Sequence, residues 1–244
     1  GEFMFERLPL WLRKSLAWSV HAFTATGAVW GFLTLLAIWE SNFKLAIVYI
    51  LIAMFVDGFD GTLARWFHVK KYADRVDGGL MDNIIDYLNY VVVAAMLLIK
   101  VPNLMPAGFE MAAAFSILLT SAYQFSQTDA KTDNDSYFFK GFPSVWNFLV
   151  VYMMLLNLNP WLNFAVLAVC NILVFVPVKY LYPTRNRRLR RFTLGFTYAY
   201  AALGFWALSQ YPDVPEWVAP VSGIYVVYYA LLSFFPKFGV ARMV

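Results

Sequence analysis

Long apolar stretches are the feature that most constrains how this chain can fold. With 61% hydrophobic and 14% charged residues over 244 positions, the chain has more apolar surface than one soluble core of this size can bury. Windows of about 20 residues, the length that crosses a bilayer as a helix, are predominantly apolar near 18–39, 43–65, 80–99, 108–127, 144–159, 161–181, 192–210 and 217–235. We therefore predict an all-α integral membrane protein with about eight transmembrane helices.

The positive charges indicate how these helices are oriented. On an eight-span path with the N-terminus inside, seventeen of the nineteen lysines and arginines lie in cytoplasmic segments, and only Lys44 and Lys100 lie outside. The net charge of +4 therefore reflects orientation in a membrane and gives no indication of nucleic-acid binding. The weakest point of the path is the break NLNP, from Asn157 to Pro160, where a miscount is easiest.

The first residues form a segment of their own. The sequence GEF at 1–3 has the character of a cloning scar, so we expect the native chain to begin at Met4 and residues 4–244 to form a single membrane domain. Between Phe5 and Leu16, apolar residues recur at spacings of three and four with basic residues among them. This pattern predicts either an amphipathic helix on the cytoplasmic surface or the ragged end of the first span.

Four aspartates interrupt the second and third apolar stretches. An ionised aspartate toward the middle of a spanning helix costs on the order of 3 kcal/mol, so these residues need a compensating partner. At about 100° per residue, Asp57 and Asp60 share one helix face, and Asp82 and Asp86 share another. Converging carboxylates repel one another unless a cation lies between them, and all-oxygen ligation suits Mg²⁺ or Mn²⁺.

Two alternatives to a metal site stay open for these acids. The aspartates can pair with Arg65, Lys70 or Arg75 as buried salt bridges, although those basic residues fall near helix ends. They can also line a cation or proton pathway, as in a transporter. A pathway explains intramembrane acids but not why glycines and Arg65 share their spacing.

The order of residues around the aspartates resembles the motif of the CDP-alcohol phosphotransferase family, D-x2-D-G-x2-A-R followed by G-x3-D-x3-D. The matching positions are Asp57, Asp60, Gly61, Ala64, Arg65, Gly78, Asp82 and Asp86. The spacer from Trp66 to Asp77 is longer than in the common family pattern. This spacer and the segments HAFTATGA and FFKGFPSVWN resemble the bacterial phosphatidylcholine synthase branch of the family.

The resemblance implies an activity and a role for each motif residue. Family members transfer a phosphatidyl or related group from a CDP-linked donor to an alcohol with Mg²⁺ or Mn²⁺, and in this branch the donor is CDP-diacylglycerol and the acceptor choline. By resemblance, Asp57, Asp60 and Asp82 ligate metal, and Asp86 is the general base and a further metal contact. The expected CDP-binding residues are Gly61, Ala64, Arg65 and Gly78.

Several properties remain as expectations or alternatives. The resemblance implies a homodimer, and we expect it to lie in the bacterial inner membrane in contact with membrane lipids. The distribution of lysines and arginines predicts that both termini and the active site face the cytoplasm. An acceptor other than choline, such as serine, inositol phosphate or glycerol phosphate, uses the same chemistry and stays open. If the residues around Asp86 were basic and not aromatic, they would favour an acceptor that carries a phosphate group.

Choline carries a quaternary ammonium group, which aromatic faces bind well. Candidates at the predicted depth of Asp86 are Tyr90, Tyr123, Tyr137, Trp146 and Asn147. In a chain with 9 Trp, 15 Tyr and 23 Phe, a lipid-facing or core position explains any single aromatic as well. His21, Thr24 and Thr26 either border the nucleotide or serve helix packing.

Overall fold

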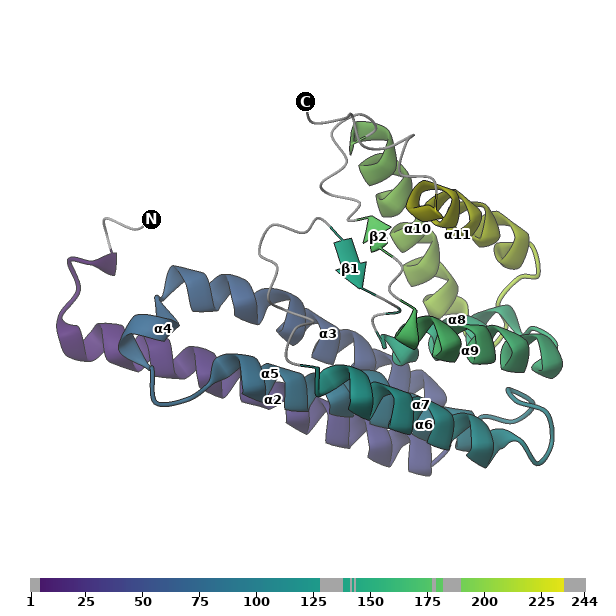
Figure 1. The fold of residues 1–244 in the computed structure, drawn as a ribbon, viewed down its shortest axis with the longest axis horizontal. Helices are drawn as coiled ribbons and strands as arrows, with labels where there is room; N and C mark the ends of the chain where they lie inside the picture. Colours follow the sequence, from purple (N-terminus) through teal and green to yellow (C-terminus); the bar gives the residue numbers. More distant parts are fainter. Residues whose placement is uncertain are drawn as a thin grey trace. The chain divides into compact units, whose positions relative to one another are not determined.

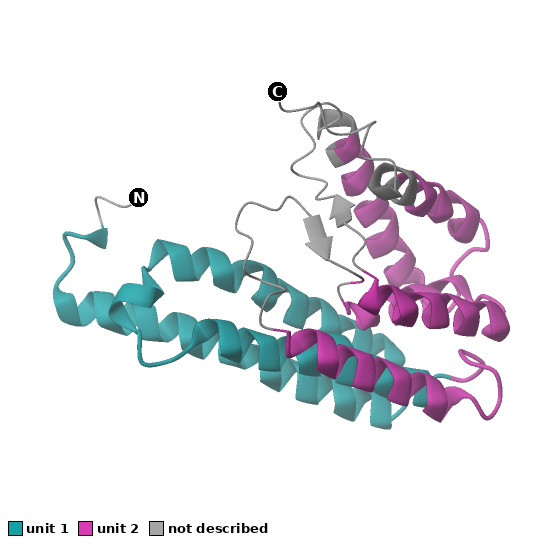
Figure 2. Cartoon of the chain, in the orientation of Figure 1, with its two compact units in different colours: residues 1–101 teal, residues 102–244 magenta. Residues whose placement is uncertain are grey.

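The computed structural model describes residues 5–127, 138–140, 142, 144–176, 179–181 and 190–234, and for 138–140, 179–181, 190–192, 194 and 229–234 it describes the backbone alone (Figure 1). The described chain is helical apart from two three-residue strands, which confirms the predicted all-α class. It divides into two compact units, unit 1 (residues 1–101) and unit 2 (residues 102–244) (Figure 2).

Unit 1 is built on three long helical segments. Helices α2 (Leu10–Trp39) and α3 (Phe43–Trp66) form a hairpin. The third segment is continuous through α5 (Gly78–Asp86), the π-helix η1 (Tyr87–Val92) and α6 (Val93–Lys100). A short helix, α4 (Val69–Tyr72), lies between α3 and α5 in the chain. Because α2 packs against both other segments, it is the central helix of the unit.

Two glycines of α2 allow the third segment to approach closely. A Cβ atom added to Gly27 would lie 2.8 Å from Cγ2 of Ile85, and one added to Gly31 would lie 2.4 Å from Oδ1 of Asn89. The buried Asn89 donates a hydrogen bond of 3.1 Å from Nδ2 to the carbonyl oxygen of Gly27. Residues without bulk at helix interfaces permit such backbone contacts in membrane proteins.

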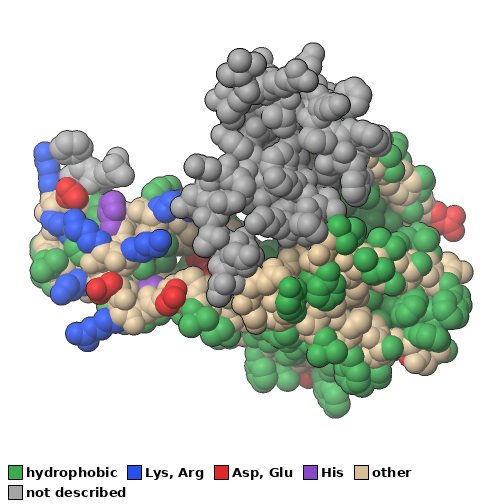
Figure 3. Space-filling view, viewed as in Figure 1, with side chains coloured by type: hydrophobic (Ala, Val, Ile, Leu, Met, Phe, Trp, Pro, Cys, Tyr) green, Lys and Arg blue, Asp and Glu red, His purple; other side chains and the backbone are tan. Residues whose placement is uncertain are grey.

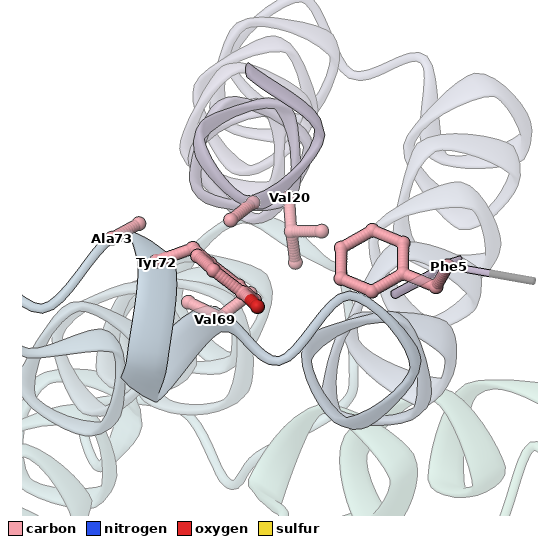
Figure 4. Close-up of a cluster of buried hydrophobic side chains, with 6 residues drawn as sticks. Phe5, Val20, Val69, Tyr72 and Ala73 are labelled. Atoms are coloured by element: carbon pink, nitrogen blue, oxygen red, sulfur yellow. The ribbon is translucent and has the colours of Figure 1, made fainter. Parts of the chain in front are cut away.

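The long motif spacer packs against the start of the chain. Val69 and Tyr72 of α4, with Ala73, form a buried cluster with Phe5 and with Val20 of α2 (Figure 4). The ring of Phe5 meets that of Tyr72 edge to face, with centroids 5.9 Å apart. The spacer is therefore a packed element of unit 1.

Unit 2 contains shorter helices and the two strands. Its described elements are α7 (Glu110–Phe125), β1 (Phe138–Lys140), α8 (Trp146–Leu156), α9 (Pro160–Phe175), β2 (Lys179–Leu181), α10 (Arg190–Gln210) and α11 (Val218–Phe234). The strands pair antiparallel, with Phe139 opposite Tyr180. Leu155, Ala207 and Val218 form a small core where α8, α10 and α11 meet.

The break predicted between the fifth and sixth apolar stretches is present. Asn157 ends α8 in the left-handed conformation at φ 46°, and the Asn159 side chain caps α9 by accepting a hydrogen bond from the Trp161 amide. Proline at the first position of α9 fits this start, since its missing N–H would be unpaired there in any case. The sequence therefore placed this helix boundary correctly.

A described helix overlaps each of the eight predicted apolar stretches, although the stretch 161–181 ends in strand β2, and the structure does not confirm eight membrane crossings. Among the described residues, two helical segments are long and apolar enough to cross a bilayer, Leu10–Trp39 and Gly78–Lys100. Helix α8 has 11 residues, about 16 Å, and a hydrocarbon core is about 30 Å thick. A separate N-terminal amphipathic helix is not confirmed either, because α2 runs without a break from Leu10.

Candidate functional site

Three of the four motif aspartates meet at one place in unit 1. Asp57 on α3 and Asp82 and Asp86 on α5 each offer a carboxylate oxygen, and these oxygens lie within 4.8 Å of one another. All three residues are partly buried. Asp82 and Asp86 are one helical turn apart and so share a face of α5, as the sequence predicted. The apolar packing of α2 against both segments brings Asp57 to that face.

This group of oxygens fits a hard divalent cation. Ligands on opposite sides of an octahedral Mg²⁺ ion lie about 4.2 Å apart, since each bond is about 2.1 Å. The limit of 4.8 Å between the three carboxylate oxygens is close to that distance. Without a cation, three carboxylates held this close among apolar helices repel one another strongly. The donor set therefore suits Mg²⁺ or Mn²⁺.

Asp60 lies just outside the three-carboxylate group. Its side chain interacts with the Thr24 side chain and with the backbone at Gly61, and the Asp57 carboxylate is close enough to act on it electrostatically. Thr24 is buried on α2. The structure therefore places Thr24, one of the sequence candidates, beside a motif aspartate.

Tyr90 contacts the acidic group directly. Its hydroxyl donates a hydrogen bond of 2.6 Å to Oδ2 of Asp57. Tyr90 belongs to the π-helix η1, which begins immediately after Asp86. Interruptions of this type occur frequently at functional sites because they change which side chains face a neighbour. The sequence placed Tyr90 near Asp86 but did not predict the bond to Asp57.

The proposed CDP-binding residues lie on the same two helices. Arg65 is exposed, donates a hydrogen bond of 3.0 Å from Nη2 to Oγ1 of Thr62, and folds back along α3 toward Gly61. A Cβ atom at Gly61 would lie 3.6 Å from Nη1 of Arg65. Ala64 packs partly against the Phe5 cluster. An exposed guanidinium one turn after a glycine is available to a phosphate group.

Gly78 begins α5 against a buried histidine. A Cβ atom at Gly78 would lie 3.2 Å from Cε1 of His21, so a larger residue would crowd the ring. Nε2 of His21 lies 3.2 Å from the carbonyl oxygen of Ala73. These contacts favour a helix-packing role for His21. Thr26 is exposed and donates to the carbonyl oxygen of Phe23 in its own helix.

Basic side chains gather at the end of unit 1 that carries the N-terminus (Figure 3). The exposed residues there include Arg7, Lys14, Lys70, Lys71 and Arg75. Nearby, the Arg13 guanidinium donates a hydrogen bond to the hydroxyl of Tyr72 and so lowers the pKa of that phenol, and Lys71 contributes in the same direction. Acidic side chains lie among these basic ones, and Lys71 forms an ion pair with Glu6 at 3.9 Å (Figure 3).

The remaining choline candidates belong to unit 2 or lie outside the described residues. Trp146 has no exposed surface and donates a hydrogen bond of 2.7 Å from Nε1 to Oγ of Ser121. Asn147 is buried and accepts from the Phe148 amide. Tyr123 is 52% exposed and contacts the Phe175 ring. Tyr137 lies outside the described residues.

The sequence did not predict the residues that hold the third segment, which carries Asp82 and Asp86, against α2. Gly27, Gly31 and Asn89 fasten η1 to α2, and no role was predicted for them. A signal was present, since two glycines four residues apart in an apolar helix are typical of close helix contacts. The π-helix itself has no comparable signal in the sequence.

With this geometry established, comparison with known proteins identifies the class. The chain matches the CDP-alcohol phosphatidyltransferase family over residues 19–180, and it belongs to that family of transferases. Similar curated proteins are phosphatidylcholine synthases. That of Legionella pneumophila is 40% identical, covering 90% of this chain and 88% of the relative. That of Rhizobium johnstonii is 35% identical, covering 97% and 98%. The family and the apolar helices together indicate a membrane protein of phospholipid biosynthesis.

Proposed function

We propose that the protein transfers the phosphatidyl group of CDP-diacylglycerol to choline, forming phosphatidylcholine and releasing CMP. The observation that carries this proposal is the meeting of Asp57, Asp82 and Asp86 from two helices, in the order of the family motif. Relatives that cover nearly the whole chain are phosphatidylcholine synthases, which supports choline as the acceptor.

The proposed metal ligands are Asp57, Asp60, Asp82 and Asp86. A bound Mg²⁺ or Mn²⁺ ion would neutralise charge on the diphosphate and on the departing CMP. Asp60 remains in the set because it lies three residues from Asp57 on the same helix, and a side-chain rotation changes where its carboxylate points. Arg65, Gly61, Ala64 and Gly78 would accommodate the CDP group, with the guanidinium beside a phosphate.

The chain's own residues supply alignment and one proton transfer. The hydroxyl oxygen of choline forms a new bond to the lipid-bearing phosphorus, and the bond from that phosphorus to the CMP oxygen breaks, with CMP taking the electron pair. Asp86 accepts the hydroxyl proton as the new bond forms. Asp86 is suited to this because it is partly buried within the acidic group. Exclusion of water by the surrounding apolar helices would limit hydrolysis of the donor.

The proposed setting is a bacterial inner membrane, crossed about eight times, with the site facing the cytoplasm. The predicted asymmetry of lysines and arginines supports this orientation, as does the short sequence distance of eight residues between Asp57 and Arg65. We also propose that the amphipathic segment from Phe5 to Leu16 lies on the membrane surface, that residues 4–244 function as one domain, and that the enzyme is a homodimer as its family resemblance implies.

The choline pocket is the least defined part of the proposal. Tyr90, Tyr123, Tyr137, Trp146 and Asn147 remain its candidates. The exposed ring of Tyr123 supports that residue, whereas the hydroxyl of Tyr90 is bonded to Asp57. For Trp146 and Asn147, burial leaves no exposed face for a cation in the described structure.

One assay tests the proposed function. Purified protein would be given CDP-diacylglycerol, Mn²⁺ or Mg²⁺, and a panel of labelled choline, serine, inositol phosphate and glycerol phosphate. We expect labelled phosphatidylcholine and an equal amount of CMP with choline alone. Product with another alcohol would replace choline as the acceptor. No CMP release with any alcohol, in protein that remains folded, would contradict the proposal.

A further inference from the structure

We propose that Tyr90 is a positioning residue whose hydroxyl holds the Asp57 carboxylate toward Asp82 and Asp86. This inference rests on the proposed metal-dependent function, and it assigns Tyr90 a different role from the choline contact that the sequence suggested. The evidence is the 2.6 Å hydrogen bond from the Tyr90 hydroxyl to Oδ2 of Asp57. Asp57 is the one member of the three-carboxylate group that α3 supplies.

The hydrogen bond restrains Asp57 without using up its capacity to bind a cation. A carboxylate has about four lone-pair sites on its two oxygens, so one accepted bond leaves the others available. The donor is neutral, and it therefore fixes the orientation of the carboxylate without replacing the cation that the acidic group requires. Hydrogen bonds of this kind to metal-binding carboxylates orient them and tune metal affinity.

Helix packing at the neighbouring residue helps to place Tyr90. The preceding residue, Asn89, is fastened to α2 by its bond to the Gly27 carbonyl oxygen, and the missing side chain of Gly31 makes room for it. Successive residues of η1 therefore bond to two different helices, Asn89 to α2 and Tyr90 to α3. The π-helix that contains both residues starts directly after Asp86, so the same segment aligns Asp86 and Asp57.

The π-helix η1 explains how neighbouring residues can bond to two different helices. A wider turn shifts the angular position of every side chain that follows it, and such a turn is less favourable than a regular α-helical turn. In η1 this change in direction affects Asn89 and Tyr90, the two polar side chains that bond to neighbouring helices across an apolar interface. The two hydrogen bonds offset the unfavourable backbone geometry because an unpaired amide or phenol in that environment would be costly.

The test compares Tyr90→Phe with Tyr49→Phe. Both substitutions remove one hydroxyl from a partly buried tyrosine of unit 1, but Tyr49 contacts Trp30 and lies eight residues before Asp57 on α3. Mn²⁺ affinity would be measured on the purified full chain without substrates, by electron paramagnetic resonance of free Mn²⁺ and by the Mn²⁺-dependent rise in melting temperature. The KM for choline would be measured separately at saturating Mn²⁺.

We expect Tyr90→Phe to weaken Mn²⁺ binding about tenfold to a hundredfold, with the choline KM within about twofold of the parent. Tyr49→Phe should change neither quantity. Unchanged or tighter Mn²⁺ binding in Tyr90→Phe would overturn the inference. The choline-contact alternative predicts instead that Tyr90→Ala raises the choline KM while Tyr90→Phe, which keeps the ring, does not alter Mn²⁺ affinity. If the parent protein itself binds no Mn²⁺, the proposed metal-dependent function fails. That result differs from failure of the Tyr90 inference, in which the parent binds Mn²⁺ and Tyr90→Phe binds it equally well.

Discussion

The two units of the molecule hold their helices together by different means. In unit 1, α2 meets the third segment through Gly27, Gly31 and the amide of Asn89. In unit 2, helices are linked by hydroxyl and amide pairs. Examples are Thr120 with Asn171 at 2.7 Å and Tyr152 with Ser222 at 2.6 Å.

The acids are distributed differently as well. Within unit 1, Asp57, Asp82 and Asp86 lie on helix faces inside the packed structure. In the described part of unit 2, Glu110 is the first residue of α7, and Asp213 and Glu216 lie between α10 and α11. Neutral hydrogen bonds are sufficient to join apolar helices. Carboxylates on helix faces are therefore better explained by chemistry than by packing.

The largest expected effect follows from removing a charge from the acidic group. Asp57→Asn, Asp60→Asn and Asp82→Asn should each abolish CMP release, because a shared metal site loses one ligand charge. The protein should still insert and fold, since loss of an intramembrane charge relieves an energetic cost. Asp213→Asn, in the exposed loop of unit 2, is the matched control and should retain activity. Full activity in any motif variant would remove that residue from the site.

Asp86→Asn should separate the chemical step from donor binding. Loss of a general base should lower kcat by roughly a hundredfold to ten-thousandfold. Binding of CDP-diacylglycerol, measured with the purified variant, should change much less. A near-normal kcat with weakened donor binding would show instead that Asp86 is a metal ligand and that the base lies elsewhere.

Trp146→Ala tests whether an aromatic residue of unit 2 belongs to the core or to a choline pocket. Because the ring is fully buried and bonded to Ser121, we expect a loss of about 3 to 5 kcal/mol in the free energy of unfolding. Thermal unfolding in detergent would measure it, and the choline KM of the remaining folded protein should be unchanged. A raised choline KM with normal stability would assign Trp146 to the pocket.

The smallest expected effect compares one glycine from each unit. Gly31→Ala should destabilise the protein by about 1 to 3 kcal/mol, because the new methyl group would overlap Asn89 and force η1 away from α2. Gly204→Ala, on α10, has no neighbouring atom within 4 Å of the added carbon and should be neutral or stabilising by up to about 1 kcal/mol. Equal effects of the two substitutions would contradict the close packing described for unit 1.

The sequence by itself determined the features that depend on local pattern. Apolar runs placed the eight helical stretches, and NLNP placed the boundary between α8 and α9. The helical period placed Asp82 and Asp86 on one face, and the motif predicted that Asp57 would join them. The shared face of Asp82 and Asp86 was predictable because the spacing of residues along a helix fixes which of them share a face. The motif also included Asp60, which lies outside the three-carboxylate group.

Only the tertiary structure decided which neighbours these faces meet. The hydroxyl of Tyr90 bonds to Asp57, the Asp60 side chain interacts with Thr24, and the Trp146 ring is buried in unit 2. None of these three contacts follows from the position of the residue in the sequence. The π-helix and the cluster formed by Phe5 with α4 were not predicted at all. Such contacts depend on the rotation and separation of helices that are distant in the sequence, and side-chain packing at each interface sets both.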